Sequence, residues 1–263
     1  MAKSKKVKTS TTSATKQQDQ TDNKKTQTTT SLQQQKNTRF PTLIPKSHLE
    51  VTELEPNQIY LIPQFFTRKE CQSLITYFDT HLKPQAVSSL IPKPGEAFRS
   101  NDRQSMQDSL LANKIWSLGL DQVCTSNEGI HTVSLPRRPC GLNSNLRIYR
   151  YRPGQRFEAH YDDSVKDTVT GHWTDWTLLI YLNGGGSDSN DKDGLEGGET
   201  VFYKEDIGGN KKKKRVPKRD PLVVQPEEGL ALLHRHGQHC LLHEALEVTR
   251  GNKWVLRSDV LIG

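Results

Sequence analysis

Between residues 146 and 263 the chain is a succession of short apolar segments separated by turn-forming residues, and this pattern limits the possible folds most. The predicted strands span residues 146–151, 156–160, 174–182, 200–203, 222–224, 229–234, 239–248 and 253–261. Turn formers such as Pro153-Gly154, Gly197-Gly198 and Gly251-Asn252 separate them. Short strands with glycine-rich turns are typical of a β-sandwich or jelly roll.

The segment before these strands carries helical signals. Thr67 is followed three residues later by Glu70, which predicts a capping box at a helix N-terminus. A second helix is predicted over residues 108–118. The residues expected on the buried sides are Cys71, Leu74, Ile75 and Phe78 in the first helix and Leu110, Leu111, Ile115 and Trp116 in the second. Helices ahead of strands predict an α+β arrangement. Residues 101–103 are interpreted as either a capped turn or a contact at a pocket mouth.

Positive charge is concentrated in two segments. Residues 1–40 carry nine Lys/Arg and two acidic residues, so the rest of the chain holds 28 of each sign. Within that rest, a predicted loop at 204–220 holds eight basic and three acidic residues. The body is therefore mildly acidic, which argues against a broad nucleic-acid-binding face. Residues 1–38 have almost no apolar side chains and are predicted to be a disordered basic and polar tail, followed by one domain over 39–263.

The sequence also bears on location. The four cysteines form no Cys-x-x-Cys pair, and no apolar run reaches the roughly 20 residues that span a bilayer. We therefore expect an intracellular protein, cytoplasmic or nuclear, without a membrane partner. The basic run at 211–219 is interpreted as either a nuclear localisation signal or a solvated insertion. We do not expect nucleic acid as the main partner; any binding of nucleic acid would involve this run or the tail.

A candidate metal site begins at the end of a predicted strand. His160 and Asp162 flank Tyr161 there, so their side chains can share one face. An imidazole and a carboxylate are two of the three ligands in the facial triad that holds non-haem Fe(II) with positions left open. Candidates for the third ligand are His234, His236, His239 and His243. An alternative places His239 and His243 one turn apart on a zinc-binding helix, which the predicted strands around them disfavour.

A candidate anion site lies further along the chain. Lys253 and Arg257 are predicted to share one face of the last strand. A dicarboxylate ligand needs a cation in a dry pocket, and either residue could provide it. The competing interpretation is that both are ordinary cations facing solvent.

An ordered set of motifs spans roughly residues 56–262. In chain order it comprises Ile62-Pro63-x-Phe65-Phe66-Thr67-x-x-Glu70-Cys71, Tyr151-x-x-Gly154-Gln155-x-Phe157-x-x-His160-x-Asp162, Gly197-Gly198-Glu199-Thr200-Val201-Phe202, Pro226-x-x-Gly229-x-Ala231, His243 and Gly251-Asn252-Lys253-Trp254. This set resembles the prolyl 4-hydroxylase branch of the 2-oxoglutarate/Fe(II) oxygenases. The resemblance implies a double-stranded β-helix of the jelly-roll, cupin-like type with supporting N-terminal helices.

The resemblance also implies residue roles. It assigns His160, Asp162 and His243 to Fe(II), Lys253 and Tyr151 to the C5 carboxylate of 2-oxoglutarate, and Arg257 as the second choice for that anchor. We further expect Thr177 and Tyr181, which face the same side of their strand as Leu179, to line the pocket.

The implied function is a dioxygenase that hydroxylates a substrate, with a protein side chain such as proline favoured, and releases succinate and CO2. Its cofactor and cosubstrates would be Fe(II), 2-oxoglutarate and O2, with ascorbate as a further candidate. One alternative is an oxygenase for a small-molecule metabolite or an alkylated nucleic acid. Another is a catalytically silent binding module on the same fold, which the retained ligands and cation argue against.

Overall fold

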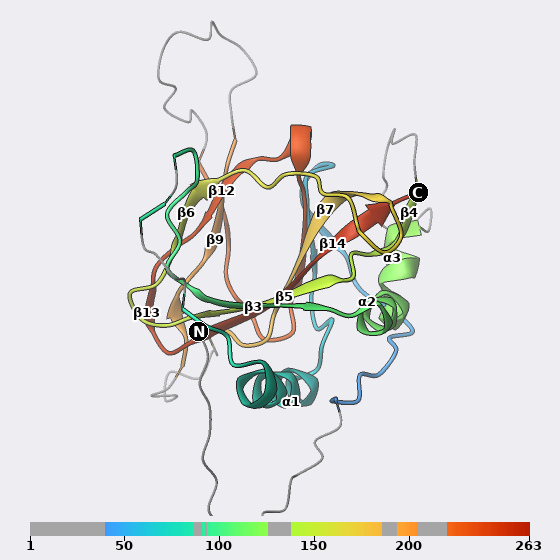
Figure 1. The fold of residues 1–263 in the computed structure, drawn as a ribbon, viewed down its shortest axis with the longest axis horizontal. Coiled ribbons are helices and arrows are strands. Elements are labelled where there is room, and N and C mark those ends of the chain that lie inside the picture. Colours follow the sequence, from blue (N-terminus) through green and yellow to red (C-terminus); the bar gives the residue numbers. More distant parts are fainter. Residues whose placement is uncertain (1–39, 87–90, 93, 126–137, 186–193, 205–219) are drawn as a thin grey trace, which may run out of the picture. The chain divides into compact units, whose positions relative to one another are not determined.

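The computed structural model describes residues 40–86, 91–92, 94–125, 138–185, 194–204 and 220–263 (Figure 1). The predicted tail at 1–38 and the basic run at 211–219 lie outside these ranges, so both stay predictions. Within the described part of the chain, none of the helices has the length and apolar character needed to cross a bilayer.

Helix α1 (Arg68–Tyr77) begins with the predicted capping box. The Thr67 hydroxyl accepts a hydrogen bond from the Glu70 amide at 3.3 Å, and the Glu70 carboxylate accepts one from the Thr67 amide at 2.8 Å. These two bonds satisfy backbone donors at the start of the helix. Buried Cys71 and Leu74 turn its apolar side inward, and a π-helical turn, η1 (Phe78–Leu82), follows it.

The second predicted helix is shorter than expected. Helix α2 (Ser109–Ile115) gives way to a π-helical turn, η2 (Trp116–Leu120), and then to α3 (Asp121–Thr125). The prediction that Leu110 is buried is wrong, because its side chain is 82% exposed while Leu111 and Ile115 are buried. Neighbouring residues of a helix point about 100° apart, whereas residues four positions apart share a face. Leu111 therefore lies on the same face as Ile115, and Leu110 does not.

Residues 101–103 form neither a capped turn nor a pocket mouth. They lead into strand β3 (Asp102–Gln107), which pairs with β5 (Asn145–Tyr151). Asp102 is buried and forms ion pairs with Arg150 at 2.8 Å and Arg152 at 2.9 Å. Met106 is the one apolar residue of β3, so the sequence carried almost no strand signal there.

Two antiparallel sheets form the body (Figure 1). The larger has the order β1-β2-β11-β7-β14-β5-β3, with β4 paired to β14, and the smaller has the order β10-β9-β12-β6. The remaining strands of the larger sheet are β1 (Thr52–Glu55), β2 (Ile59–Ile62), β4 (Pro139–Leu142), β7 (Trp173–Tyr181), β11 (Ala231–Arg235) and β14 (Lys253–Ile262). The smaller sheet contains β6 (Phe157–His160), β9 (Thr200–Tyr203), β10 (Leu222–Val224) and β12 (Leu242–Ala245).

The strands of the two sheets interleave along the sequence. Strands β5, β7, β11 and β14 lie in the larger sheet, and β6, β9, β10 and β12 lie in the smaller one. This alternation is the double-stranded β-helix, and the predicted jelly-roll fold is confirmed. The short strands β8 (Glu196–Gly197) and β13 (Val248–Arg250) pair with each other beside it.

One predicted strand is interrupted. Residues 239–248 were expected to be continuous, but they divide into the end of a 3-10 turn, η3 (Gly237–His239), then β12, then the start of β13. The Leu246 amide donates to the Glu199 carbonyl at 2.9 Å, and the chain then pairs with β8 instead of continuing along β9. The partner strand therefore changes at this point.

Alternate residues of the larger sheet face two different cores. Ile148 and Leu256 belong to a core shared with helices α1 and α2, whereas Tyr149 and Val255 belong to a core shared with the smaller sheet. Strand side chains alternate between faces, so β5 and β14 each contribute to both cores. The second core, between the two sheets, surrounds the candidate site.

Candidate metal centre

The three predicted ligands converge between the two sheets. His160 ends β6 and lies directly opposite His243 in the pairing with β12. Asp162 follows two residues after β6, and one ligand atom from each of the three residues lies within 4.8 Å of the others. His160 Nε2 is 3.8 Å from Asp162 Oδ1, and His243 Nε2 is 3.6 Å from Asp162 Oδ2. The fold therefore brings together residues that are up to 83 positions apart.

Backbone carbonyls orient both imidazoles. His160 Nδ1 lies 2.8 Å from the Glu158 carbonyl oxygen, and His243 Nδ1 lies 2.9 Å from the Leu241 carbonyl oxygen. Because a carbonyl oxygen only accepts, Nδ1 carries a proton in each ring, and Nε2 is the nitrogen whose lone pair each neutral ring would offer to a metal. This is the usual arrangement of metal-binding histidines. The zinc-helix alternative is wrong, because His243 lies in a strand and His239 is exposed.

Asp162 is fixed from two directions. Its Oδ1 accepts from Arg257 Nη1 at 3.1 Å, and its Oδ2 accepts from the Thr177 hydroxyl at 3.0 Å. Burial would raise the pKa of this carboxyl, but the Arg257 guanidinium and the neighbouring imidazoles hold it well below the ordinary value. Asp162 is therefore a carboxylate, as a metal ligand must be.

The two imidazoles differ in proton affinity. Burial lowers the pKa of His160 to about 3. Burial also opposes charge on His243, but its contacts with Asp162 raise its pKa to about 9. Two imidazole nitrogens and one carboxylate oxygen are the donor set that suits Fe(II) with positions left open, so the residues present fit that ion.

Lys253 lies in the same core, 2% exposed. It stands opposite Tyr151 in the β14–β5 pairing, and its Nζ is 5.1 Å from the centre of the Tyr151 ring and 5.3 Å from that of Tyr181. Its Nζ donates to the Gly198 carbonyl, and burial lowers its pKa to about 7. A Cβ on Gly198 would lie 3.0 Å from Lys253 Cδ, so the glycine makes room for the lysine.

Arg257 is placed differently. Its guanidinium donates to Asp162, and its Nη2 lies 3.3 Å from Asp259 Oδ1. Two carboxylates thus already share its donors. One cavity is lined by all of the predicted ligands and anchors, namely His160, Asp162, His243, Lys253, Tyr151 and Arg257. A metal and an anionic ligand held by these residues would be neighbours.

Residues 146–258 match the family model described as the 2OG-Fe(II) oxygenase superfamily. The chain is also 28% identical over 221 residues to probable prolyl 4-hydroxylase 3 of Arabidopsis thaliana, an alignment that covers 78% of this chain and 69% of that protein. Residues 146–258 therefore carry a 2OG-Fe(II) oxygenase domain.

Other proteins similar to this chain are prolyl hydroxylases by name. Prolyl 4-hydroxylase 5 of Arabidopsis thaliana is 29% identical over 224 residues, with 78% of this chain and 68% of that protein covered. Solved structures of a Pseudomonas putida prolyl-4-hydroxylase and of a viral collagen prolyl hydroxylase from Paramecium Bursaria Chlorella virus-1 give TM-scores of 0.48 and 0.47. They are 14% and 17% identical, and the alignments cover 78% of this chain and 92% and 96% of those chains.

The prediction that Thr177 and Tyr181 line the pocket is wrong. Leu179, in the same strand, lines the cavity instead. Thr177 holds Asp162 through its hydroxyl, and Tyr181 packs its ring near Lys253 while its own hydroxyl bonds the Thr200 hydroxyl at 2.7 Å. Thr177 and Tyr181 thus position other residues of the site.

Sequence reasoning missed Arg99. Its guanidinium stacks 3.6 Å from the centre of the Phe157 ring at the cavity wall, and its Nε is buried without a hydrogen-bond partner among the described residues. Arg99 is placed at the cavity wall by an isolated β-bridge to Phe157. Its sequence neighbourhood has no helical or strand periodicity that would have predicted this position. His234, the last residue of the strand predicted at 229–234, lies inside β11 and lines the cavity.

Proposed function

We propose that this oxygenase hydroxylates prolyl side chains of a protein substrate in a reaction that consumes 2-oxoglutarate and O2 and releases succinate and CO2. The observation that carries the proposal is the cavity shared by the His160, Asp162 and His243 cluster and the buried cation Lys253. The names of the relatives, prolyl 4-hydroxylases, support proline as the target.

Fe(II), held by His160, Asp162 and His243, would supply the oxidising chemistry together with 2-oxoglutarate and O2. The two histidines contribute neutral imidazole nitrogens, whose direction the Glu158 and Leu241 carbonyls fix. Arg257 and Thr177 hold the Asp162 carboxylate in place from outside the cluster. The protein thus contributes a preoriented donor set in a sheltered cavity.

Lys253 is the better candidate for the 2-oxoglutarate anchor. An ammonium group has three donors, and the one hydrogen bond described for Lys253 goes to the Gly198 carbonyl. Arg257, by contrast, is shared between the carboxylates of Asp162 and Asp259. Burial disfavours the charged form of Lys253, and a carboxylate entering beside it would compensate that charge. The Tyr151 and Tyr181 rings would exclude water around the pair.

Two expectations belong to the same proposal. Ascorbate is expected to sustain turnover, which an assay with and without it would test. The cytoplasmic or nuclear location is expected from the sequence and is tested by imaging the tagged full-length chain.

The function is tested by incubating the purified protein with Fe(II), 2-oxoglutarate and O2 in the presence of proline-containing peptide libraries. We expect succinate release that rises with peptide, together with a peptide product heavier by one oxygen atom on proline. His160→Ala is the matched control and should give neither signal. Peptide-independent products on nucleosides or metabolites, with no oxidised peptide, would overturn the assignment to proline. No succinate under any condition would overturn the oxygenase activity.

A further inference from the structure

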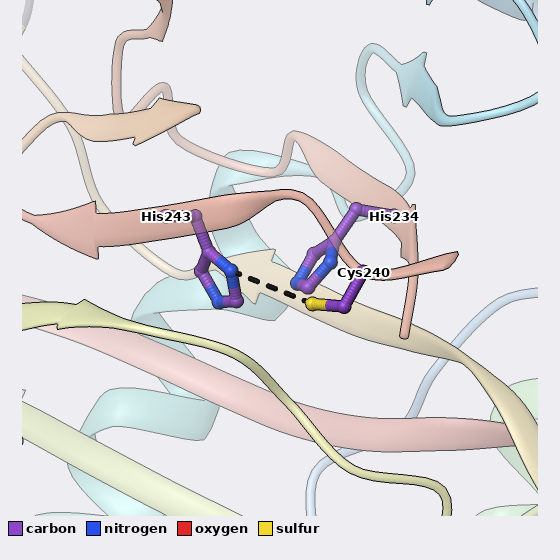
Figure 2. Close-up of side chains that lie close together, drawn as sticks. All are labelled: His234, Cys240 and His243. Carbon is purple, nitrogen blue, oxygen red and sulfur yellow. Dashed lines mark hydrogen bonds between the residues drawn. The ribbon is translucent and has the colours of Figure 1, made fainter. Parts of the chain in front are cut away.

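A third imidazole, which is buried, stands beside the predicted metal ligands. His234 lies in β11, is 1% exposed, and places its Nε2 3.7 Å from Asp162 Oδ2. Its ring centre is 4.6 Å from that of His243. Figure 2 shows His234 and His243 gathered around the same space together with Cys240, and one ligand atom of each lies within 4.8 Å of the others.

Hydrogen bonding determines the tautomer of His234. Its Nδ1 lies 3.1 Å from the Arg235 carbonyl oxygen, so Nδ1 donates and Nε2 presents a lone pair. Within the described residues, this Nε2 is buried without a hydrogen-bond partner. A lone pair facing a carboxylate oxygen in a dry core is unfavourable, and buried polar atoms are nearly always satisfied. A cation between His234 and Asp162 would satisfy both groups.

His234 therefore matches the two predicted histidine ligands in each relevant respect. In His160, His234 and His243 alike, Nδ1 is held by a backbone carbonyl, at 2.8, 3.1 and 2.9 Å. In each, Nε2 lies between 3.6 and 3.8 Å from an oxygen of Asp162. All three line one cavity.

We propose that His234 is a third imidazole ligand of the metal in the protein before 2-oxoglutarate binds. The proposal rests on the metal site of the proposed function. The facial triad leaves positions open on the ion, and His234 would fill one of them. The resting centre would then have three histidines and one aspartate.

Cys240 is the other donor in this group, but its thiol is already engaged. The Asp162 amide donates to Cys240 Sγ at 3.2 Å, and Sγ lies 3.3 Å from the Leu241 carbonyl oxygen. These contacts link the residues after β6 to the start of β12, next to two of the ligands. Cys240 thus holds the backbone of the site. His234 Nε2 is the nitrogen that faces Asp162 with no hydrogen-bond partner among the described residues.

The structure provides a direct way to count the ligands. Because all three imidazoles have a proton on Nδ1, each one bound to high-spin Co(II) through Nε2 should give one strongly shifted, exchangeable N–H proton signal. We expect three such signals in the Co(II)-loaded full-length protein in H2O, and their loss in D2O. Two signals would overturn the assignment of His234, whereas no shifted signal would overturn the metal site itself.

Two variants show whether His234 gives the third proton signal. His234→Phe should reduce the count to two and raise the Co(II) dissociation constant at least about tenfold, since even changes to residues that only support a ligand cost that much. His239→Phe, on the exposed turn η3, is the matched control and should keep all three signals. Three signals remaining in His234→Phe would overturn the proposal. If that variant does not fold, the count in the unaltered protein decides the question alone.

Discussion

Arg257 Nη1 lies 3.1 Å from Asp162 Oδ1, and this ion pair joins two residues 95 positions apart in the sequence. Both are nearly buried, and Arg257 also contacts Asp259. The pair fixes the carboxylate that the metal site needs. Because Arg257 is shared between two carboxylates, we propose Lys253 ahead of it as the anchor for a dicarboxylate.

Removing the arginine should therefore destabilise the metal-free protein strongly. Arg257→Met leaves the buried Asp162 carboxylate without its arginine, whereas Asp259 keeps its ion pair with Arg147. Breaking a buried pair in this way costs about 3–5 kcal/mol. Urea unfolding in the presence of a chelator measures this loss. Arg156→Met, which breaks the exposed pair with Glu158, is the control and should cost less than about 1 kcal/mol. Equal losses for both variants would contradict the structural role of Arg257.

Affinity for 2-oxoglutarate should depend on the charge of Lys253. Burial lowers the pKa of Lys253 to about 7, so above pH 7 the free protein holds this lysine neutral. Binding a carboxylate there then requires proton uptake. The dissociation constant for 2-oxoglutarate should rise about tenfold per pH unit above pH 7. Calorimetric titrations between pH 6 and 9 measure it. In Lys253→Arg the cation stays charged, and a pH slope that persisted there would point to another anchor.

The same buried lysine should lower the stability of the protein when 2-oxoglutarate is not bound. Its pKa is about 7 when folded and about 10.5 when exposed, so the unfolded chain binds the proton more tightly between these values. Stability should accordingly rise with pH across that window, and Lys253→Met should stabilise the protein most below pH 7. We expect a gain of roughly 1–3 kcal/mol at pH 6 in chemical unfolding, with 2-oxoglutarate binding lost. A destabilised variant would mean that the ammonium is well satisfied in the fold.

Metal binding should release a proton from His243. Its contacts with Asp162 raise its pKa to about 9, so at pH 7 this imidazole is protonated before it can bind a metal. His160 has a pKa of about 3 and is already neutral. We expect release of about one proton per Co(II) at pH 7, and an affinity that rises with pH up to about 9. Calorimetry in buffers of different ionisation enthalpy counts the protons. A count near zero would contradict the pairing of His243 with Asp162.

Much of this site could be predicted from the sequence. The spacing of His160 and Asp162, the position of His243 and the Gly-Asn-Lys-Trp run around Lys253 all carried signals, and the fold brings these residues to one cavity. Their convergence depends on the pairing of His243 with His160 across β12 and β6. The order of short strands and turns in the sequence also predicted the jelly-roll fold.

The rest depended on contacts that have no local signal. All five residues of β11 are buried, so no alternation showed that His234 faces the metal cavity. Arg257 meets Asp162 only through the strand order of the larger sheet. Strand β3 ends the strand order of the larger sheet, and its one buried residue, Asp102, is held by ion pairs with arginines and not by apolar packing. Long-range ion pairs of this kind cannot be read from residue periodicity.

The central claim is that one cavity holds Fe(II) through His160, Asp162 and His243 and anchors 2-oxoglutarate at Lys253. Its most direct test is the visible charge-transfer absorption that arises when 2-oxoglutarate chelates Fe(II), measured without oxygen. We predict a band in the unaltered protein that saturates with 2-oxoglutarate, is absent in His243→Ala, and needs far more 2-oxoglutarate in Lys253→Ala. A protein that gives no band at saturating Fe(II) and 2-oxoglutarate, or a His243→Ala variant that gives the full band, would contradict the account.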